Sequence, residues 1–222
     1  LFKSNNKSAH SRCNLNFISH KFINKSNYDI INLHWLGNEM FSIEEIGKIN
    51  KPIVWKLADQ WAFSGAEHYS CYLDPNGKTN FCYRYKNGYL KSNRPPGESG
   101  IDINKLAWQR KFKSWKKQIH IICPSLWLAS CARKSLLMKN WPIHVIPNSI
   151  DTNIWYPQEK IYARKKLGLS IDKSILFMNG TLGLQDLRKG GDLLLKTLKI
   201  LSENYSNDNF HEIELIALGQ NK

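Results

Sequence analysis

The sequence predicts an α/β protein that contains parallel β-sheet, and three observations lead to this fold class. Residues 29–58 read as a β-rich run, an amphipathic segment and a second β-rich run, and residues 174–219 repeat that order. Strands joined through a helix pair in parallel, so each stretch is expected to form a βαβ unit. Residues 148–173 hold turn residues and one short helical piece, which indicates a connection between two domains.

The first βαβ unit is expected to comprise strand DIINLHW (29–35), helix MFSIEEIGKIN (40–50) and strand KPIVWKLA (51–58). Ser42 and Glu45 have the spacing of a capping box, which predicts where this helix begins. Residues 1–27 show no sustained period and are expected to be a loop or the remains of a lost element. Residues 71–101 carry the turn signals DPNG and RPPGESG and are also expected to be loop.

Further elements complete the first domain. Large apolar residues recur at steps of four, three and four in residues 102–119: Trp108, Phe112, Trp115 and Ile119. This spacing predicts a helix that buries them and turns its lysines and arginines to solvent. A strand at 119–123, a helix that starts at Pro124 and Ser125, and a strand at 143–147 follow.

The second βαβ unit is expected to comprise strand 174–178, glycine-bearing loop 179–191, helix 192–201 and strand 213–219. The expected division is therefore a domain at 1–150, a linker at 151–173 and the start of a second domain at 174–222.

Charge and cysteine content limit the possible environments. The 222 residues carry a formal charge of +14, and residues 84–139 hold thirteen Lys or Arg against only Glu98 and Asp102, a local net charge of +11. Such a zone indicates either an anionic partner or a solvated basic surface. The five cysteines lack framework spacing, no signal peptide opens the chain, and no apolar run reaches membrane-spanning length. A reducing cytoplasm is the expected location.

Two polar residues follow the first two predicted strands. His34 ends the first strand and Asp59 ends the next, at the edge where open parallel sheets bind ligands. His34 is a candidate for proton transfer or for orienting a hydroxyl, unless the backbone satisfies its ring. The Asp59 carboxylate is a candidate acceptor for a polyol.

Other candidates for substrate binding lie in the loop after Asp59 and after the fourth strand. Trp61 and Phe63 either stack on a sugar or base or pack under the loop. Glu67 and His68 form either an acid–base pair or a surface ion pair, and no metal site is expected there. Asn148 and Asp151 either line a cleft or act only as turn residues.

The glycine-bearing loop of the second unit suits a diphosphate. Its cations Arg188 and Lys189 precede a helix N-terminus with free N–H groups, and Gly180 and Thr181 follow the strand. The loop is neither a Walker A nor a G-x-G-x-x-G sequence. The plainer interpretation is a capped surface helix with ordinary lysines.

The segments INLHW, KPIVWKLADQWAFSGAEHYS, IICPSLWLASCARKS, VIPNSIDTNIWYP and DLRKGGDLLLKTL follow one another along the chain. In order and spacing they resemble glycosyltransferase family 4, in particular its bacterial envelope and exopolysaccharide branch. The resemblance covers about Asp29 to Gly219. It implies a GT-B architecture: two Rossmann-like domains that face each other across a cleft, the first for the acceptor and the second for a nucleotide-sugar donor.

The resemblance also implies a mechanism. Members are retaining transferases that need neither a metal ion nor another cofactor. The acceptor hydroxyl attacks from the face on which the diphosphate leaves, so cations and backbone donors must stabilise the departing charge. Lys189 matches the family lysine that contacts the donor diphosphate, and Arg188 is its neighbour.

The sequence departs from the family pattern at three places. Relatives commonly carry TLHDMW where this chain has KLADQW, so the family histidine aligns with Ala58, and its role is lost or taken by Asp59, His34 or His68. Many members have Gly-Arg where this chain has Gly180 and Thr181. The family's pair of glutamates and the opening glycine loop are not recognised, so the chain is expected to be truncated at both ends and, alone, to have little activity.

The expected function is transfer of a sugar to a glycan or lipid-linked acceptor in bacterial surface polysaccharide synthesis. The protein is expected in the cytoplasm or on the inner face of the plasma membrane, where the basic region 105–139 contacts anionic lipid. One alternative is a non-catalytic relative. The other is a nucleic-acid-binding protein, although that class needs exposed aromatics and the helix aromatics keep apolar spacing. No nucleic-acid partner is expected.

Overall fold

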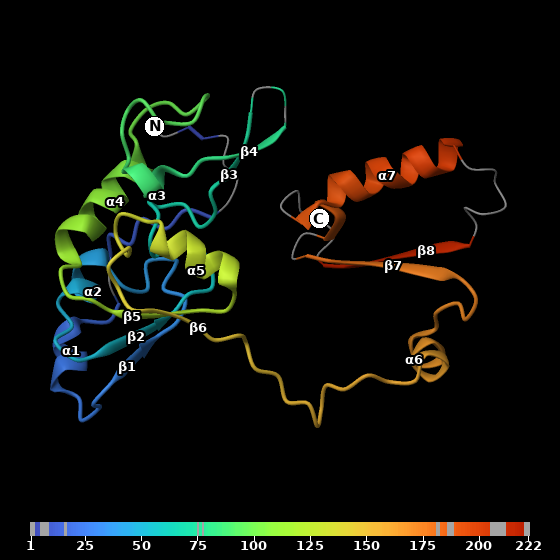
Figure 1. Cartoon of the computed structure of the whole chain (residues 1–222), viewed down its shortest axis with the longest axis horizontal. Coiled ribbons are helices and arrows are strands. Elements are labelled where there is room, and N and C mark those ends of the chain that lie inside the picture. The colour runs from blue at the N-terminus through green and yellow to red at the C-terminus, as the bar shows by residue number, and fades with distance from the viewer. Residues whose placement is uncertain are drawn as a thin grey trace. The chain divides into compact units, whose positions relative to one another are not determined.

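The chain forms two compact units, Leu1–Ser149 (unit 1) and Ile150–Lys222 (unit 2), drawn in Figure 1. The structure, a computed structural model, describes residues 3–4, 9–15, 17–74, 76, 78–180, 183–185, 189–204 and 212–219. No helix within these ranges is both long enough and apolar enough to cross a bilayer.

Unit 1 is built on a four-stranded sheet of β1 (Ile31–Leu33), β2 (Ile53–Lys56), β5 (His120–Cys123) and β6 (Ile143–Val145), in the order β1-β2-β5-β6. All neighbouring strands are parallel, and the register places Leu33, Trp55, Ile121 and Ile143 side by side across the sheet. The α/β class and the parallel pairing expected from the sequence are therefore confirmed.

The two faces of this sheet differ in chemistry because side chains alternate along each strand. Leu33, Trp55 and Ile121 are buried on one face, whereas His120 and His144 are exposed on the other. Helices α4 and α5 lie on one side of the sheet in Figure 1. The core of unit 1 therefore forms between the buried face and these helices.

Side-chain caps begin the helices α2 (Ile43–Gly47), α4 (Ile103–Ser114) and α5 (Leu126–Arg133) of unit 1. The Ser42 hydroxyl accepts the Glu45 N–H at 3.2 Å, which confirms the expected start of α2. Asp102 caps α4 through Lys105 N–H at 2.9 Å, and Ser125 caps α5 through Leu128 N–H at 3.2 Å.

The expected buried face of the 102–119 helix is wrong. The helix ends at Ser114, so Trp115 and Ile119 are buried but lie beyond it. Inside α4 the buried side chains are Asn104, Ala107 and Lys111, and Phe112 is 49% exposed. The spacing of the aromatic residues gave the wrong buried face for two reasons. These residues extend past the end of the helix, and Lys111 is buried because its amine donates hydrogen bonds to buried carbonyl groups.

Two stretches expected to be loop contain regular structure. Residues 1–27 include α1 (His20–Lys25). Residues 71–101 include an antiparallel hairpin of β3 (Cys71–Leu73) and β4 (Thr79–Phe81), followed by α3 (Arg84–Asn87). The hairpin turn is held by Asp74, whose N–H donates to Lys78 O at 2.9 Å and whose carboxylate accepts the N–H of Lys78 at 2.8 Å.

Unit 2 contains α6 (Lys160–Leu167), β7 (Ser174–Asn179), the 3-10 turn η1 (Gly183–Gln185), α7 (Gly191–Asn204) and β8 (Ile213–Leu218). Strands β7 and β8 pair in parallel from Ser174↔Ile213 to Asn179↔Leu218. The expected βαβ order of this segment is confirmed.

We predict that Gly47→Ala destabilises unit 1. A Cβ at Gly47 meets the Ser114 carbonyl oxygen at 2.5 Å, and this contact is with backbone. Overpacking of this kind is expected to lower the free energy of unfolding by about 2 kcal/mol, outweighing alanine's helix preference over glycine. Urea denaturation measures the change, with Lys21→Ala on α1 as the surface control. An unchanged or raised stability for Gly47→Ala contradicts the close packing of α2 on α4.

Candidate functional site

The carboxyl edge of the four-stranded sheet gathers the residues that follow each strand. His34 follows β1 and Asn148 follows β6, and both are exposed. Trp35, next to His34, is 40% exposed, and its indole Nε1 donates to Asp59 Oδ2 at 2.9 Å. The ends of β1 and β2 are therefore joined directly at this edge, beside an exposed imidazole.

The Asp59 carboxylate is the anchor of the loop that follows β2, residues 59–68. Its Oδ2 accepts from Trp35 Nε1 and lies 2.6 Å from His68 Nδ1. Its Oδ1 accepts the backbone N–H of Trp61 at 2.9 Å. Asp59 is buried and both of its oxygens are engaged within unit 1, so it fixes the positions of Trp35 and His68.

Ser11 completes a chain of three polar groups. Its hydroxyl lies 2.8 Å from His68 Nε2 and accepts the Asn38 N–H at 3.2 Å. The hydrogen bonds are consistent when His68 carries its proton on Nδ1, toward Asp59. A Ser–His–Asp chain activates a serine nucleophile in many hydrolases. Here Ser11 is 2% exposed and His68 1%, so no substrate carbonyl reaches the hydroxyl, and the chain joins distant segments.

Trp61 packs beneath the loop. It is buried, its indole N–H donates to Ser11 O at 2.8 Å, and its ring lies against His68 and Trp115. Phe63 is also buried and meets Tyr85 edge to face. Neither ring offers an open face to a sugar in this conformation.

Glu67 is a buried carboxylate held by the hydroxyl of Tyr89. Burial raises the pKa of Glu67, and the Tyr89 hydrogen bond opposes that shift. Burial also raises the pKa of Tyr89 well above its ordinary value. The Tyr89 hydroxyl additionally accepts the Gly65 N–H at 2.6 Å. Glu67 and His68, adjacent in sequence, thus belong to two separate polar networks.

Lys111 holds the loop from the side of α4. Its fully buried amine donates to the carbonyls of Trp61, Ser64 and Gly65, the last two at 3.1 and 2.7 Å. It also lies 3.7 Å from the centre of the Trp61 ring. Burial lowers the pKa of Lys111 to about 7, and the negative groups around it, led by Glu67, oppose that shift.

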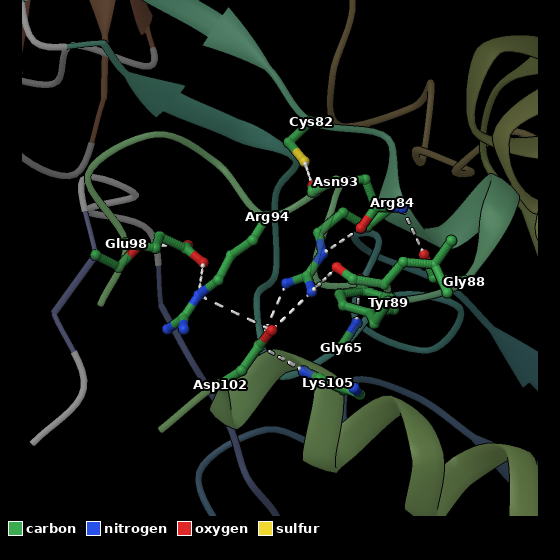
Figure 2. Close-up of polar contacts among 12 residues, drawn as sticks. Gly65, Cys82, Arg84, Gly88, Tyr89, Asn93, Arg94, Glu98, Asp102 and Lys105 are labelled. Atoms are coloured by element: carbon green, nitrogen blue, oxygen red, sulfur yellow. Dashed lines mark hydrogen bonds and ion pairs between the residues drawn. The ribbon is translucent and has the colours of Figure 1, made fainter. Parts of the chain in front are cut away.

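A cluster around Arg84 supports Tyr89 from the segment after the hairpin, as Figure 2 shows. The Arg84 guanidinium pairs with Asp102 at 2.7 and 3.2 Å and donates to Asn93 Oδ1 at 3.1 Å. Its carbon lies 4.5 Å above the Tyr89 ring. Because Tyr89 contacts both Gly65 and Glu67, this cluster positions the far end of the loop.

The segment 9–15 forms the remaining wall of the site. Ser11 N–H donates to Ala66 O at 2.8 Å, and His68 N–H donates to Ala9 O at 3.0 Å. Arg110 on α4 donates to Cys13 O at 2.9 Å. Sequence reasoning missed this segment, Ser11 included, because it has no periodicity. It missed Lys111 as well. Asn104, Ala107 and Lys111 are spaced by three and four residues, and this spacing could have indicated that they share the buried face of the helix.

The donor-side candidates lie in unit 2. Gly180 is buried after β7, and Lys189 is exposed just before α7. Thr181 and Arg188 lie outside the described residues. The loop is tightly packed: a Cβ on Gly191 meets Leu184 O at 1.9 Å, and one on Gly219 meets Gly180 O at 2.1 Å. A helix N-terminus with a neighbouring cation suits an anion, although Asp192 also occupies the first turn of α7.

Asp151, in unit 2, forms a turn. Its carboxylate accepts the Asn153 N–H at 2.9 Å, and its carbonyl accepts the Trp155 N–H at 2.8 Å. The contacts of Asp151 described above are those of a turn residue. Asp59, Trp61, Glu67 and His68 belong to one loop of unit 1, and His34 follows the neighbouring strand β1.

Neither comparison with known proteins nor a search for metal-ligand geometry assigns a further role to the residues of the candidate site. No family model matches the sequence, and no curated protein matches it significantly. Within the described ranges, no three His, Cys, Asp or Glu side chains are arranged to hold a metal ion. The carboxyl edge of the sheet therefore presents the exposed imidazole of His34, the indole of Trp35 held by Asp59, and the exposed amide of Asn148. The loop 59–68, which is hydrogen-bonded within unit 1, lies next to Trp35.

We predict that Lys111→Met destabilises unit 1 more than a change at an exposed lysine of the same helix. The substitution leaves three buried carbonyls without their shared donor, which is expected to cost about 3 kcal/mol of unfolding free energy. The matched control Lys113→Met, at an exposed position, is expected to change stability by less than about 0.5 kcal/mol. Urea denaturation of both variants tests this, and equal effects contradict the role assigned to Lys111.

We further predict a pH dependence that belongs to Lys111. Its pKa is about 7 in the folded protein against the ordinary 10.5, so above pH 7 the unfolded chain binds more protons at this residue. The contribution of Lys111 to unfolding free energy therefore rises with pH from about 7 upward. Denaturation between neutral and mildly alkaline pH is expected to show a steeper upward slope for the native chain than for Lys111→Met. Parallel slopes contradict the prediction.

Proposed function

We propose that the protein is a retaining glycosyltransferase of GT-B type, in which unit 1 binds the acceptor and unit 2 binds the donor. The observation that carries the proposal is the carboxyl edge of the parallel sheet, where exposed His34 lies beside Trp35 and the loop anchored by Asp59. Ligands of open parallel sheets bind at this edge. The motif order of the sequence favours a nucleotide-sugar donor and a glycan or lipid-linked acceptor.

In this proposal His34 acts on the acceptor. Its exposed imidazole follows β1 and forms no hydrogen bond with another described residue, so it is free to orient the acceptor hydroxyl or receive its proton. Asp59 is a positioning residue, because its oxygens hold Trp35, Trp61 and His68. In the proposal, the loop 59–68 supports the acceptor site from behind, and His34 and Asn148 contact the substrate.

Unit 2 is proposed to bind the diphosphate of the donor. Lys189 and the N-terminal N–H groups of α7 would stabilise the charge that develops as the diphosphate leaves. Thr181 and Arg188 are proposed to take part from the same loop. The reaction as proposed uses no metal ion. The acceptor hydroxyl forms the new glycosidic bond while the bond to the diphosphate breaks on the same face.

The proposed setting is bacterial surface polysaccharide synthesis, at the cytoplasmic face of the membrane. The basic region 105–139 supports contact with anionic lipid. Two of its cations are engaged internally, however: Arg110 pairs with Glu44, and Lys111 lies inside the core. The lysines that remain exposed supply any membrane contact.

Binding and transfer assays with UDP-, GDP- and ADP-sugars test the proposal. Calorimetry is expected to detect one nucleotide-sugar class, and Lys189→Ala is expected to weaken it about tenfold through the lost charge-assisted contact. Where transfer is measurable, His34→Ala is expected to lower kcat about 100-fold.

Matched controls are Lys199→Ala, an exposed lysine of α7, and His120→Ala, an exposed histidine on β5. Absence of binding by every donor nucleotide contradicts the proposal. Binding without transfer favours a non-catalytic relative, and preferential binding of single-stranded DNA favours the nucleic-acid alternative.

A further inference from the structure

A groove of about 760 Å³ lies between the N-terminal segment 9–15 and helix α4. Arg12 and Asn14 form one wall and residues of α4 form the other. The groove belongs to unit 1 alone, and the proposed transfer chemistry makes no use of it.

One face of α4 gives the groove an apolar floor. Ile103, Leu106, Arg110 and Lys113 line it and are spaced by three, four and three residues, so they share one side of the helix. Ile101, just before the helix, extends the floor. Ile101 is 63% exposed and Leu106 49%, so the floor presents large aliphatic side chains to solvent. Contiguous exposed apolar surface of this kind marks binding sites.

The rim of the groove is cationic. Arg12, Arg110 and Lys113 line it, and none of its lining residues is acidic. Arg110 is already engaged, since its guanidinium pairs with Glu44 at 2.6 and 2.7 Å. The side chains of Arg12 and Lys113 are exposed, and neither forms an ion pair or hydrogen bond with another described residue. The charge of Arg12 also acts on the Glu39 carboxylate and helps to lower its pKa. Two cations thus remain available beside an apolar floor.

We propose that this groove takes up one anionic phospholipid from a membrane surface. An acyl chain lies along Ile101, Ile103 and Leu106, and the phosphate lies between Arg12 and Lys113. This deepens the membrane contact named in the proposed function and rests on it for its biological setting. The lipid proposal is tested without nucleotide-sugars. A negative result for lipid binding therefore leaves the glycosyltransferase proposal standing, and the reverse also holds.

The combination of floor and rim selects this ligand class. Inorganic phosphate would meet only two solvated cations, which bind weakly in water. A zwitterionic lipid would fill the floor but give the cations no net charge to neutralise. An anionic phospholipid satisfies both, because chain burial and charge attraction add together at a membrane surface.

Vesicle flotation of the full chain tests the proposal. The native chain is expected to float with vesicles of equal phosphatidylglycerol and phosphatidylcholine at low salt, and not with phosphatidylcholine alone. The double variant Arg12→Gln/Lys113→Gln is expected to lower the partition coefficient about 25-fold, from about fivefold per cation near an anionic surface.

The matched control Lys116→Gln/Lys117→Gln removes the same charge from neighbouring residues outside the groove. Their amines are engaged by backbone carbonyls, Lys116 with Phe112 O at 2.9 Å and Lys117 with Asn50 O at 2.8 Å. This control is expected to bind nearly as the native chain does. A second pair separates the apolar contribution: Leu106→Asn is expected to weaken binding, and Ile30→Asn, at a 61% exposed site elsewhere, is not.

Four results overturn the proposal. The first is that the native chain fails to float with the anionic vesicles. The second is that the two double variants lose binding equally, which indicates a diffuse basic surface. The third is that Leu106→Asn leaves binding unchanged, and the fourth is that millimolar inorganic phosphate displaces the vesicles. Either of these indicates an anion site that does not bind a lipid chain. Circular dichroism of each variant confirms folding before flotation, and all the substituted side chains lie at exposed positions.

Discussion

The buried amine of Lys111 is the contact on which the candidate site depends. A loop of ten residues cannot bury its carbonyl groups unless something donates to them, because an unpaired buried carbonyl is costly. Lys111 supplies that donor for three carbonyls and places its charge against the face of Trp61. With the loop fixed in this way, Asp59 can hold Trp35 and His68 at the end of the sheet.

The loop is fixed from three directions by residues remote in sequence. Lys111 comes from α4, Tyr89 from the segment after the hairpin, and Ser11 from the N-terminal segment. Each contributes a hydrogen-bonding group rather than apolar area alone. A site whose members are set by directional contacts of this kind is preorganised, which suits a reaction that depends on positioning and electrostatics more than on a protein nucleophile.

The sequence predicted the parallel sheet and both βαβ units because strand length and chain order are local signals. It also predicted the Ser42 cap, which depends on a spacing of three residues. It placed Lys111 on the surface, since a lysine is normally solvated and the neighbouring aromatics suggested another face. The role of Ser11 could not be found, because it depends on a tertiary contact that leaves no pattern in residues 9–15.

The N-terminal segment also has a consequence for how unit 1 is made. Ser11 meets His68 across 57 positions, and the Arg110 contact with Cys13 spans 97. In a nascent chain, Cys13 and Trp61 therefore lack their partners Arg110 and Lys111 until α4 has emerged from the ribosome. Contacts of such separation slow folding and prolong the exposure of apolar surface. Strands β1 and β2 and the loop after them are thus synthesised before Lys111, the residue that donates to the carbonyl groups of that loop.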